Sequence, residues 1–193
     1  MDTKKIEIQR KRLIFDDKFQ IQEAEVSVQR YDGQMGKPVR RLVFERGDAA
    51  AAILFNRDSQ KILLVEQFRY PTYEKGPGWI QEVVAGVIKP DEGPEEAIRR
   101  EVEEEVGYRL QQLTPIATFY VSPGGTSERI FLYYAEVGNG DRVSAGGGLV
   151  DENEDIQLVE YSKSELRKAL TSGQFQDAKT LIAVQWLQLQ RKM

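Results

Sequence analysis

The sequence contains no cysteine and no histidine. Without thiols the chain cannot form disulfides or use a cysteine nucleophile, and without imidazole it has no serine–histidine triad and no histidine metal ligand. Catalysis would therefore have to use Asp, Glu, Lys, Tyr or Ser side chains. The N-terminal residues lack the apolar core of a signal peptide, and no apolar run is long enough to span a bilayer. These absences predict a cytoplasmic protein with no membrane partner.

The charge balance also excludes a class of partner. With 27 Lys and Arg against 31 Asp and Glu, the net charge is −4, which argues against non-specific nucleic-acid binding. An anionic substrate would need metal ions or local arginines to be attracted. A length of 193 residues and a hydrophobic content of 40% suit one well-packed domain with a small appendage.

The most informative stretch is the segment 86–108, GVIKPDEGPEEAIRREVEEEVGY. Pro94 suits the first position of a helix, after Gly93 as N-cap, because its missing N–H is not needed there. Gly107 can adopt the left-handed conformation that ends helices. The sequence therefore predicts a short helix between these residues.

Three carboxylates share one side of this helix. At about 100° per residue, Glu101, Glu104 and Glu105 fall within an arc of roughly 100° beside an apolar stripe. Such close like charges repel, so a cation is expected: Arg100 supplies one, and hard divalent ions could neutralise the rest. A solvated acidic face is the alternative, and the spacing of the motif argues against it.

The spacing in this segment resembles the Nudix box at nine defined positions, namely Gly86, five residues, Glu92, seven residues, then Arg100-Glu101-Val102-x-Glu104-Glu105-x-Gly107-Tyr108. The chain is therefore similar to Nudix hydrolases. The resemblance implies cleavage of a nucleoside diphosphate linked to another group, with Mg²⁺ or Mn²⁺. It also implies an α/β (α+β) fold, the Nudix α/β/α sandwich around a mixed sheet.

The family pattern implies metal ligands at this helix. Glu101 and Glu105 match the principal ligands, Glu104 a further one, and the carbonyl of Ala85 an extra one. Roughly two or three ions per active site are implied; paired ions about 4 Å apart polarise phosphoryl oxygens and lower the pKa of bound water. Gly86 would let the backbone approach a metal closely.

The remaining box positions are interpreted as structural. Glu92 and Arg100 are expected to brace the loop against the helix through an ion pair rather than to contact substrate. Gly107 closes the helix.

A base that activates water is expected outside the helix, in the acidic segment 151–155 that follows a glycine-rich tract. ADP-ribose pyrophosphatases of the family carry a similar Glu-Asn-Glu-Asp segment on a mobile loop. The resemblance implies Glu152 as the base and Glu154 as a residue linked to the metal. A solvated acidic turn is the alternative for Asp151 and Asp155.

Substrate contacts are implied by a second resemblance. The segment 122–129, SPGGTSER, is similar to the one that follows the box in ADP-ribose pyrophosphatases. There Glu128 would accept hydrogen bonds from sugar hydroxyls, while Pro123 and Gly124 shape the pocket. Arg46 and Arg69 match family positions that contact the base or the phosphates. A bidentate guanidinium suits phosphate, although surface ion pairs are the alternative.

Residues 1–45 predict a separate N-terminal antiparallel β-subdomain. Apolar and polar residues alternate from Phe19 to Val28, with a break near Glu23 that suggests a bulge. The sheet has few residues for a core of its own. In the ADP-ribose pyrophosphatase branch a comparable segment helps to build the dimer, so a homodimer is expected. A meander folded onto its own catalytic domain, residues 46–193, is the alternative.

Local signals predict the other elements. They indicate strands at 49–55 and 61–68 joined by a hairpin, a segment 79–87 that leads into the motif helix, further strands at 112–120, 129–136 and 156–161, and helices near 162–173 and 177–190.

Three functions fit these patterns. The first is Mg²⁺-dependent hydrolysis of ADP-ribose, a nucleoside diphosphate sugar, to AMP and ribose 5-phosphate. The tract 145–148 also resembles the GDP-mannose hydrolase branch, which is the alternative substrate class. A non-catalytic nucleotide-sugar sensor is the alternative of another kind, although a sensor has no need of a complete metal helix.

Overall fold

The computed structural model describes residues 4–149, 151 and 153–190. The chain divides into two compact units, Met1–Gly47 with Tyr120–Arg129 and Asp48–Phe119 with Ile130–Met193. The segment 120–129 belongs to the smaller unit, where the Phe44 N–H donates to the Gly125 carbonyl at 2.8 Å; the sequence analysis had assigned it to the larger part. Within the described residues, no helix combines the length and apolar character needed to cross a bilayer.

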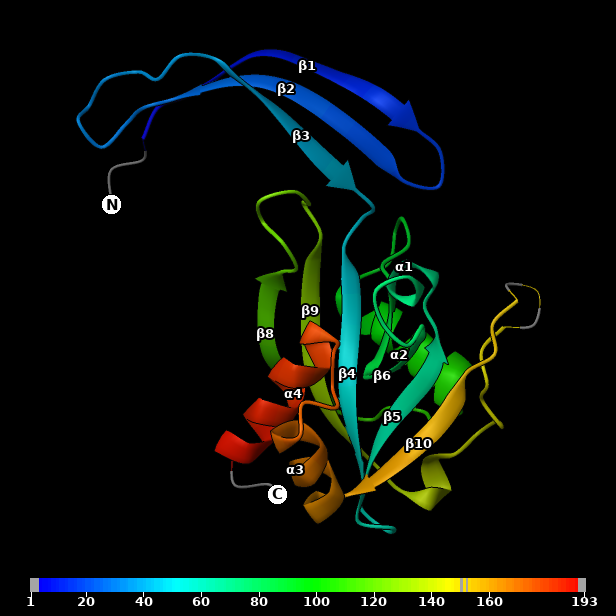
Figure 1. Ribbon diagram of the computed structural model, residues 1–193. Coiled ribbons are helices and arrows are strands. Elements are labelled where there is room, and N and C mark those ends of the chain that lie inside the picture. Colours follow the sequence, from blue (N-terminus) through cyan, green and yellow to red (C-terminus); the bar gives the residue numbers. More distant parts are fainter. Residues whose placement is uncertain (1–3, 150, 152, 191–193) are drawn as a thin grey trace. The chain divides into compact units, whose positions relative to one another are not determined.

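The smaller unit is built on a three-stranded antiparallel sheet in the order β1-β2-β3, with β1 (Ile6–Asp16), β2 (Gln20–Val28) and β3 (Val39–Glu45) (Figure 1). The break near Glu23 does coincide with a register shift, but that shift lies in β1, between Leu13 and Phe15, which pair with Gln22 and Ile21. β2 pairs with β3 in unbroken register, and the register shifts lie in β1, on the opposite side. Glu23 breaks the apolar alternation because its buried carboxylate is held by Arg12, at 2.5 Å, and by Arg40.

The larger sheet is mixed, in the order β10-β5-β4-β9-β8 with β6 on β5 and β7 on β4. β4 runs parallel to β9 and antiparallel to β5 and β7. The strands of this larger sheet are β4 (Ala49–Asn56), β5 (Lys61–Phe68), β6 (Trp79–Glu82), β7 (Val84–Val87), β8 (Thr114–Tyr120), β9 (Arg129–Val137) and β10 (Gln157–Ser162).

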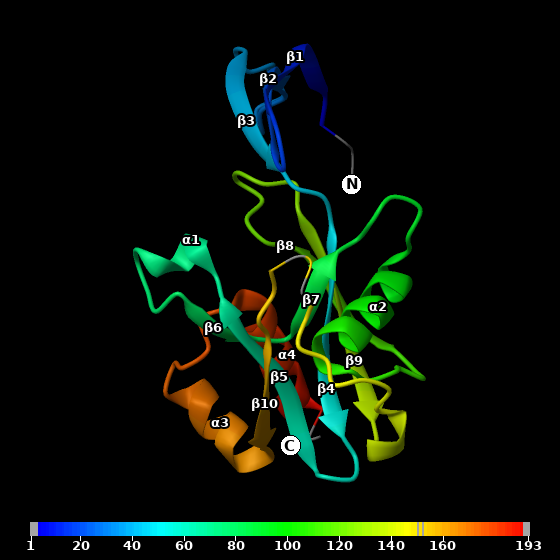
Figure 2. The ribbon, with the colours of Figure 1, turned by 90° about the vertical axis from the view of Figure 1, so that its right-hand side faces the viewer.

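Helices cover both faces of this sheet (Figure 2). They are α1 (Tyr70–Tyr73), α2 (Pro94–Val106), α3 (Lys163–Thr171) and α4 (Ala178–Leu189), with a 3-10 turn η1 (Asn139–Asp141). Alternate residues of β4 point to opposite cores: Ala51 and Ile53 pack with α3 and α4, whereas Ala52 and Leu54 pack with α2. The alanines of β4 let helices approach closely from either side. The predicted fold class, an α/β/α sandwich with a mixed sheet, is confirmed.

Two short strands precede the loop that leads to α2. The run 79–87 becomes β6, which pairs with β5, and β7, which pairs with β4. Between them Val83 is fully buried, and its N–H donates to the Thr180 hydroxyl of α4 at 2.9 Å. That side-chain hydrogen bond replaces a ladder bond where the strand changes partner.

Candidate functional site

The acidic helix α2 begins and ends where its sequence indicates. The N–H of Gly93 donates to the Glu96 carboxylate at 2.7 Å, and Pro94 opens the helix. Gly107 ends it with φ of 77°, in the left-handed region. Its apolar stripe is fully buried against β4 and β9, so the neighbouring carboxylates lie at the edge of the core.

Glu105 is the most constrained of these carboxylates. It is 4% exposed, and its Oε2 has no hydrogen-bond partner among the described residues. Burial in the first place, and then the negative charges of Glu101 and Glu82, raise the pKa of Glu105 to about 9. A buried carboxyl group that has one oxygen without a hydrogen-bond partner, and other carboxylates nearby, is suited to bind a cation.

Glu101 lies against the loop that precedes the helix. Burial raises the pKa of Glu101, although the hydrogen bond from Arg100 opposes the rise. A Cβ placed on Gly86 would lie 1.8 Å from the Glu101 Oε1 atom, so only glycine leaves room for this carboxylate. Ala85 precedes that glycine in β7 and pairs with Ala51 of β4.

Arg100 links the loop to the helix. Its Nε and Nη2 donate to both carboxylate oxygens of Glu92, at 2.9 and 3.0 Å. Its Nη1 donates to Glu101 at 2.7 Å and to Glu104 at 3.1 Å. The hydrogen bonds from Arg100 lower the pKa of Glu92 to about 2. One guanidinium therefore holds the loop and compensates part of the acidic arc.

The glycine-rich tract docks on the C-terminal end of α2. The N–H groups of Gly147 and Gly148 donate to the carbonyls of Glu105 and Glu104, at 2.8 and 3.1 Å. Glu154 follows this tract, and its negative charge helps to raise the pKa of Glu101 and of Glu105. Its carboxylate accepts from the Leu149 N–H at 3.0 Å. Glu152, the predicted base, lies outside the described residues.

Arg69 lies near the same acidic group, since its charge opposes the raised pKa of Glu105. Its Nε donates to Glu82 at 2.6 Å. Glu82 is 3% exposed and was missed by the sequence analysis, although one signal was present: a carboxylate inside the apolar run 79–87 must find a buried partner.

The smaller unit holds the other predicted substrate residues. Arg46 forms an ion pair with buried Glu128 at 3.6 Å, and its guanidinium carbon lies 5.5 Å from the Phe19 ring centroid. Pro123 and Gly124 are exposed, in a turn whose Ser122 carbonyl accepts from two following N–H groups.

The residues of the helix fit a divalent cation. All of the side-chain donors are carboxylate oxygens, the ligand type that Mg²⁺ prefers. In the described part of the chain no three acidic groups already surround one point as metal ligands do. Two of the carboxylates are instead bound to Arg100, and the third is orphaned at Glu105. The orphaned oxygen and the glycine cradle at Gly86 are the observations on which the fit rests.

The sandwich, the loop at Gly86 and the acidic helix together define a Nudix fold. The NUDIX domain model matches residues 45–183, and the chain belongs to the Nudix family. It is 40% identical to the ADP-ribose pyrophosphatase of Shigella flexneri over 162 residues, which are 82% of this chain and 76% of that protein. It is 35% identical to the GDP-mannose pyrophosphatase of Cronobacter sakazakii over 186 residues, 95% of each chain.

A solved structure shares the fold. The structure described as "Crystal structure of ADP compounds hydrolase" superposes with a TM-score of 0.73 over 100% of both chains, at 20% sequence identity. At that identity the likeness bears on the fold alone.

Proposed function

We propose that this chain hydrolyses the pyrophosphate bond of ADP-ribose, giving AMP and ribose 5-phosphate, with Mg²⁺ as its cofactor. The observation that carries the proposal is the orphaned, buried carboxylate of Glu105 within the acidic arc of the Nudix helix. The likeness to ADP-ribose pyrophosphatases supports the choice of substrate.

The side chains divide the work. Roughly two or three Mg²⁺ or Mn²⁺ ions would be held here, since paired ions are the usual arrangement at a phosphoryl centre. Their ligands would be Glu101, Glu104, Glu105 and Glu154, with the Ala85 carbonyl. When bound, such ions polarise phosphoryl oxygens and lower the pKa of water.

The other residues bind substrate and move the proton. Arg69 binds a phosphoryl oxygen through its terminal amino groups, and Glu152 takes the proton from the attacking water. In the smaller unit Glu128 accepts from sugar hydroxyls, with Arg46, Pro123 and Gly124 around the nucleotide.

A substrate panel tests this function. Purified protein with Mg²⁺ is given ADP-ribose, GDP-mannose and other nucleoside diphosphate sugars, and phosphate released by a coupled phosphatase is measured. We expect kcat/KM for ADP-ribose to exceed that for GDP-mannose by about tenfold or more, a difference of about 1.4 kcal/mol in transition-state binding. Chelation by EDTA should abolish turnover.

GDP-mannose hydrolysis is the second candidate, because relatives named GDP-mannose pyrophosphatase align with 95% of the chain or more. Faster cleavage of GDP-mannose than of ADP-ribose would make it the function. Binding of ADP-ribose with no turnover of any substrate would instead favour a nucleotide-sugar sensor.

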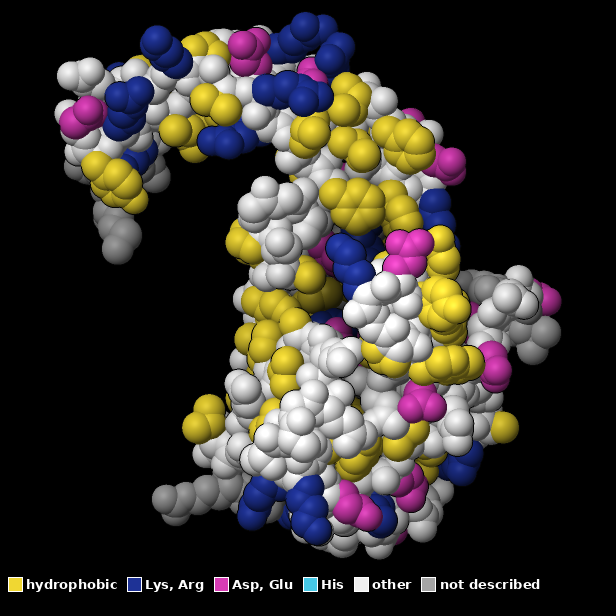
Figure 3. All heavy atoms as spheres, viewed as in Figure 1, with side chains coloured by type: hydrophobic (Ala, Val, Ile, Leu, Met, Phe, Trp, Pro, Cys, Tyr) yellow, Lys and Arg dark blue, Asp and Glu magenta, His cyan; other side chains and the backbone are white. Residues whose placement is uncertain are grey.

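We also propose that the N-terminal sheet forms a homodimer. Among the described residues of the smaller unit no hydrophobic side chain is buried, and the sheet buries the polar Glu23 and Ser27 instead. Hydrophobic side chains lie between Lys and Arg over β1–β3 in Figure 3. A sheet without a core needs a second surface. By strand register the exposed Ile6, Ile8, Leu13, Val28 and Val39 share one face of the sheet, and the exposed Phe15, Leu42 and Phe44 share the other.

The molar mass in solution checks this assembly. Light scattering should give twice the 22.1 kDa of one chain at micromolar concentration. Ile8→Glu, which places a charge among these side chains, should shift the protein toward the monomer. A monomeric wild type would favour the alternative, a sheet that covers its own catalytic domain.

A further inference from the structure

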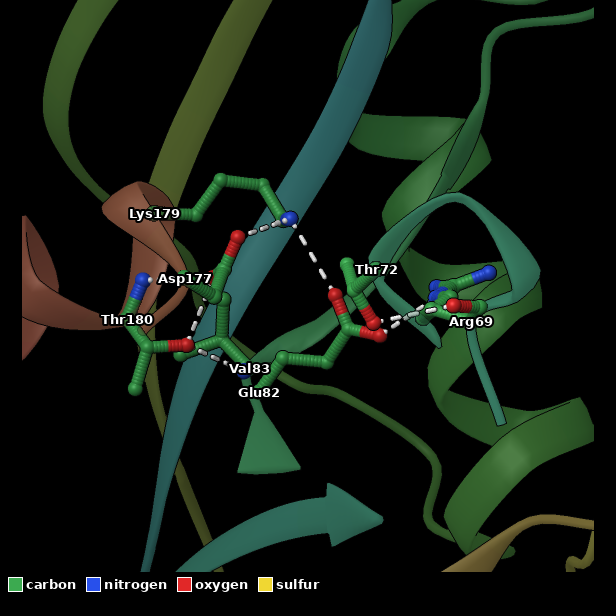
Figure 4. Close-up of polar contacts among 7 residues, drawn as sticks. All are labelled: Arg69, Thr72, Glu82, Val83, Asp177, Lys179 and Thr180. Carbon is green, nitrogen blue, oxygen red and sulfur yellow. Dashed lines mark hydrogen bonds and ion pairs between the residues drawn. The ribbon is translucent and has the colours of Figure 1, made fainter. Parts of the chain in front are cut away.

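A network of charged side chains extends from the half-exposed Arg69 to the N-terminal end of α4 (Figure 4). The Glu82 carboxylate lies between two cations: one oxygen accepts from Arg69 Nε at 2.6 Å and the other from Lys179 Nζ at 3.2 Å. Lys179 also donates to Asp177 at 2.7 Å. The group therefore contains two cations and two anions, and its charges cancel.

The end of this charge network that is far from Arg69 is held in place by α4. Asp177 is the N-cap of α4, and its second carboxylate oxygen accepts from the N–H and the hydroxyl of Thr180, at 2.9 and 2.7 Å. The Thr180 hydroxyl in turn accepts from the N–H of Val83, next to Glu82. Lys179 and Glu82 are thus fixed to the same two elements, with side chains 17% and 4% exposed.

Arg69 is fixed at its backbone and at one edge of its guanidinium. Its N–H donates to the Gly78 carbonyl at 2.7 Å, and its carbonyl accepts from the Thr72 hydroxyl at 2.9 Å. No described residue accepts a hydrogen bond from its terminal Nη groups, and the side chain is 41% exposed. Because Nε is occupied by Glu82, the plane of the guanidinium is set and the two outer amino groups remain for a ligand.

We propose that Glu82, Lys179 and Asp177 are positioning residues that hold the Arg69 guanidinium in the orientation that binds a phosphoryl group of the substrate. Lys179 is the critical member. Glu82 is 3% exposed, and Lys179 is the second cation that shares this buried carboxylate with Arg69. The proposal rests on the proposed function, in which Arg69 receives the phosphoryl oxygen.

Lys179→Met, made in the full-length protein, tests the role. The variant keeps the aliphatic stem and removes the charge that Glu82 shares. We expect KM for ADP-ribose to rise about tenfold with kcat within about threefold of wild type, because ground-state and transition-state contacts to the phosphate weaken together. Lys168→Met removes the same charge from an exposed position of α3 and should leave both constants unchanged.

A double-variant cycle separates positioning from a general structural effect. Arg69→Ala should raise KM by itself, and adding Lys179→Met to it should raise KM no further, since the second residue acts through the first. If Lys179→Met does not fold by circular dichroism, Lys179→Gln, which keeps a donor for Glu82 without charge, replaces it. An unchanged KM in the Lys179 variant, or effects of the two substitutions that multiply, would overturn the proposal.

Binding distinguishes failure of this proposal from failure of the function. ADP-ribose is titrated calorimetrically in EDTA, where no turnover occurs. If the wild type hydrolyses none of the panel, the proposed function is wrong, yet a loss of ADP-ribose binding shared by Arg69→Ala and Lys179→Met still supports the positioning role. Binding that neither substitution weakens rejects it.

Discussion

Glu105→Gln is expected to lower kcat for ADP-ribose by about 10³-fold or more, because the amide cannot provide the anionic oxygen that a hard divalent cation requires. The fold should be kept. Burial raises the pKa of Glu105 to about 9, so the metal-free protein already carries this side chain in its neutral form near pH 7. A neutral amide of the same shape then replaces a neutral acid. Steady-state kinetics in saturating Mg²⁺ measure the first effect and thermal unfolding the second.

Glu103→Gln is the matched control for this substitution. Glu103 lies on the same helix, its side chain is 46% exposed, and it pairs with Arg109 at 3.6 Å, outside the Nudix positions. The control should keep kcat within about twofold, because an exposed ion pair contributes little. If Glu105→Gln retained wild-type turnover, the assignment of Glu105 as a metal ligand would be wrong.

The local part of the site could be predicted from the sequence. Pro94 and Gly107 set the ends of α2 because each has a backbone preference that neighbours do not override. The arc of carboxylates follows from the helical period, and the spacing back to Gly86 identifies the loop that meets it. These signals are all contained within one short segment.

The contacts between distant segments could not be predicted. Glu82 and Lys179 are far apart in the sequence, and no periodicity links them. Glu23 looked like a fault in the alternation of β2 because its partners, Arg12 and Arg40, come from two other strands. In both cases a polar residue in a buried position indicated that a charged partner must lie nearby, but the partner could be identified only from the three-dimensional structure.

Gly86→Ala is expected to lower kcat about 10²-fold with little loss of stability. The added Cβ would lie 1.8 Å from Oε1 and 1.9 Å from Cδ of Glu101, far inside van der Waals contact. These atoms, together with the Glu101 Cγ at 2.5 Å, belong to a flexible side chain, so the carboxylate can swing away. A χ angle held about 30° off its rotamer costs about 0.5–1.5 kcal/mol. The backbone of β7 need not move, yet a metal ligand is displaced.

Two comparisons make the Gly86→Ala result specific. Gly140→Ala adds the same methyl group where nothing lies within 4 Å, and it should leave kcat unchanged. Glu101→Ala should cost about as much activity as Gly86→Ala, and the double variant should lose no more than either, because both changes remove the same carboxylate from the same place. Effects that multiplied would mean that Gly86 serves the reaction by a separate route, such as close approach of its backbone to the metal. A Gly86→Ala variant with wild-type kcat would show that Glu101 does not act from the position where α2 holds it.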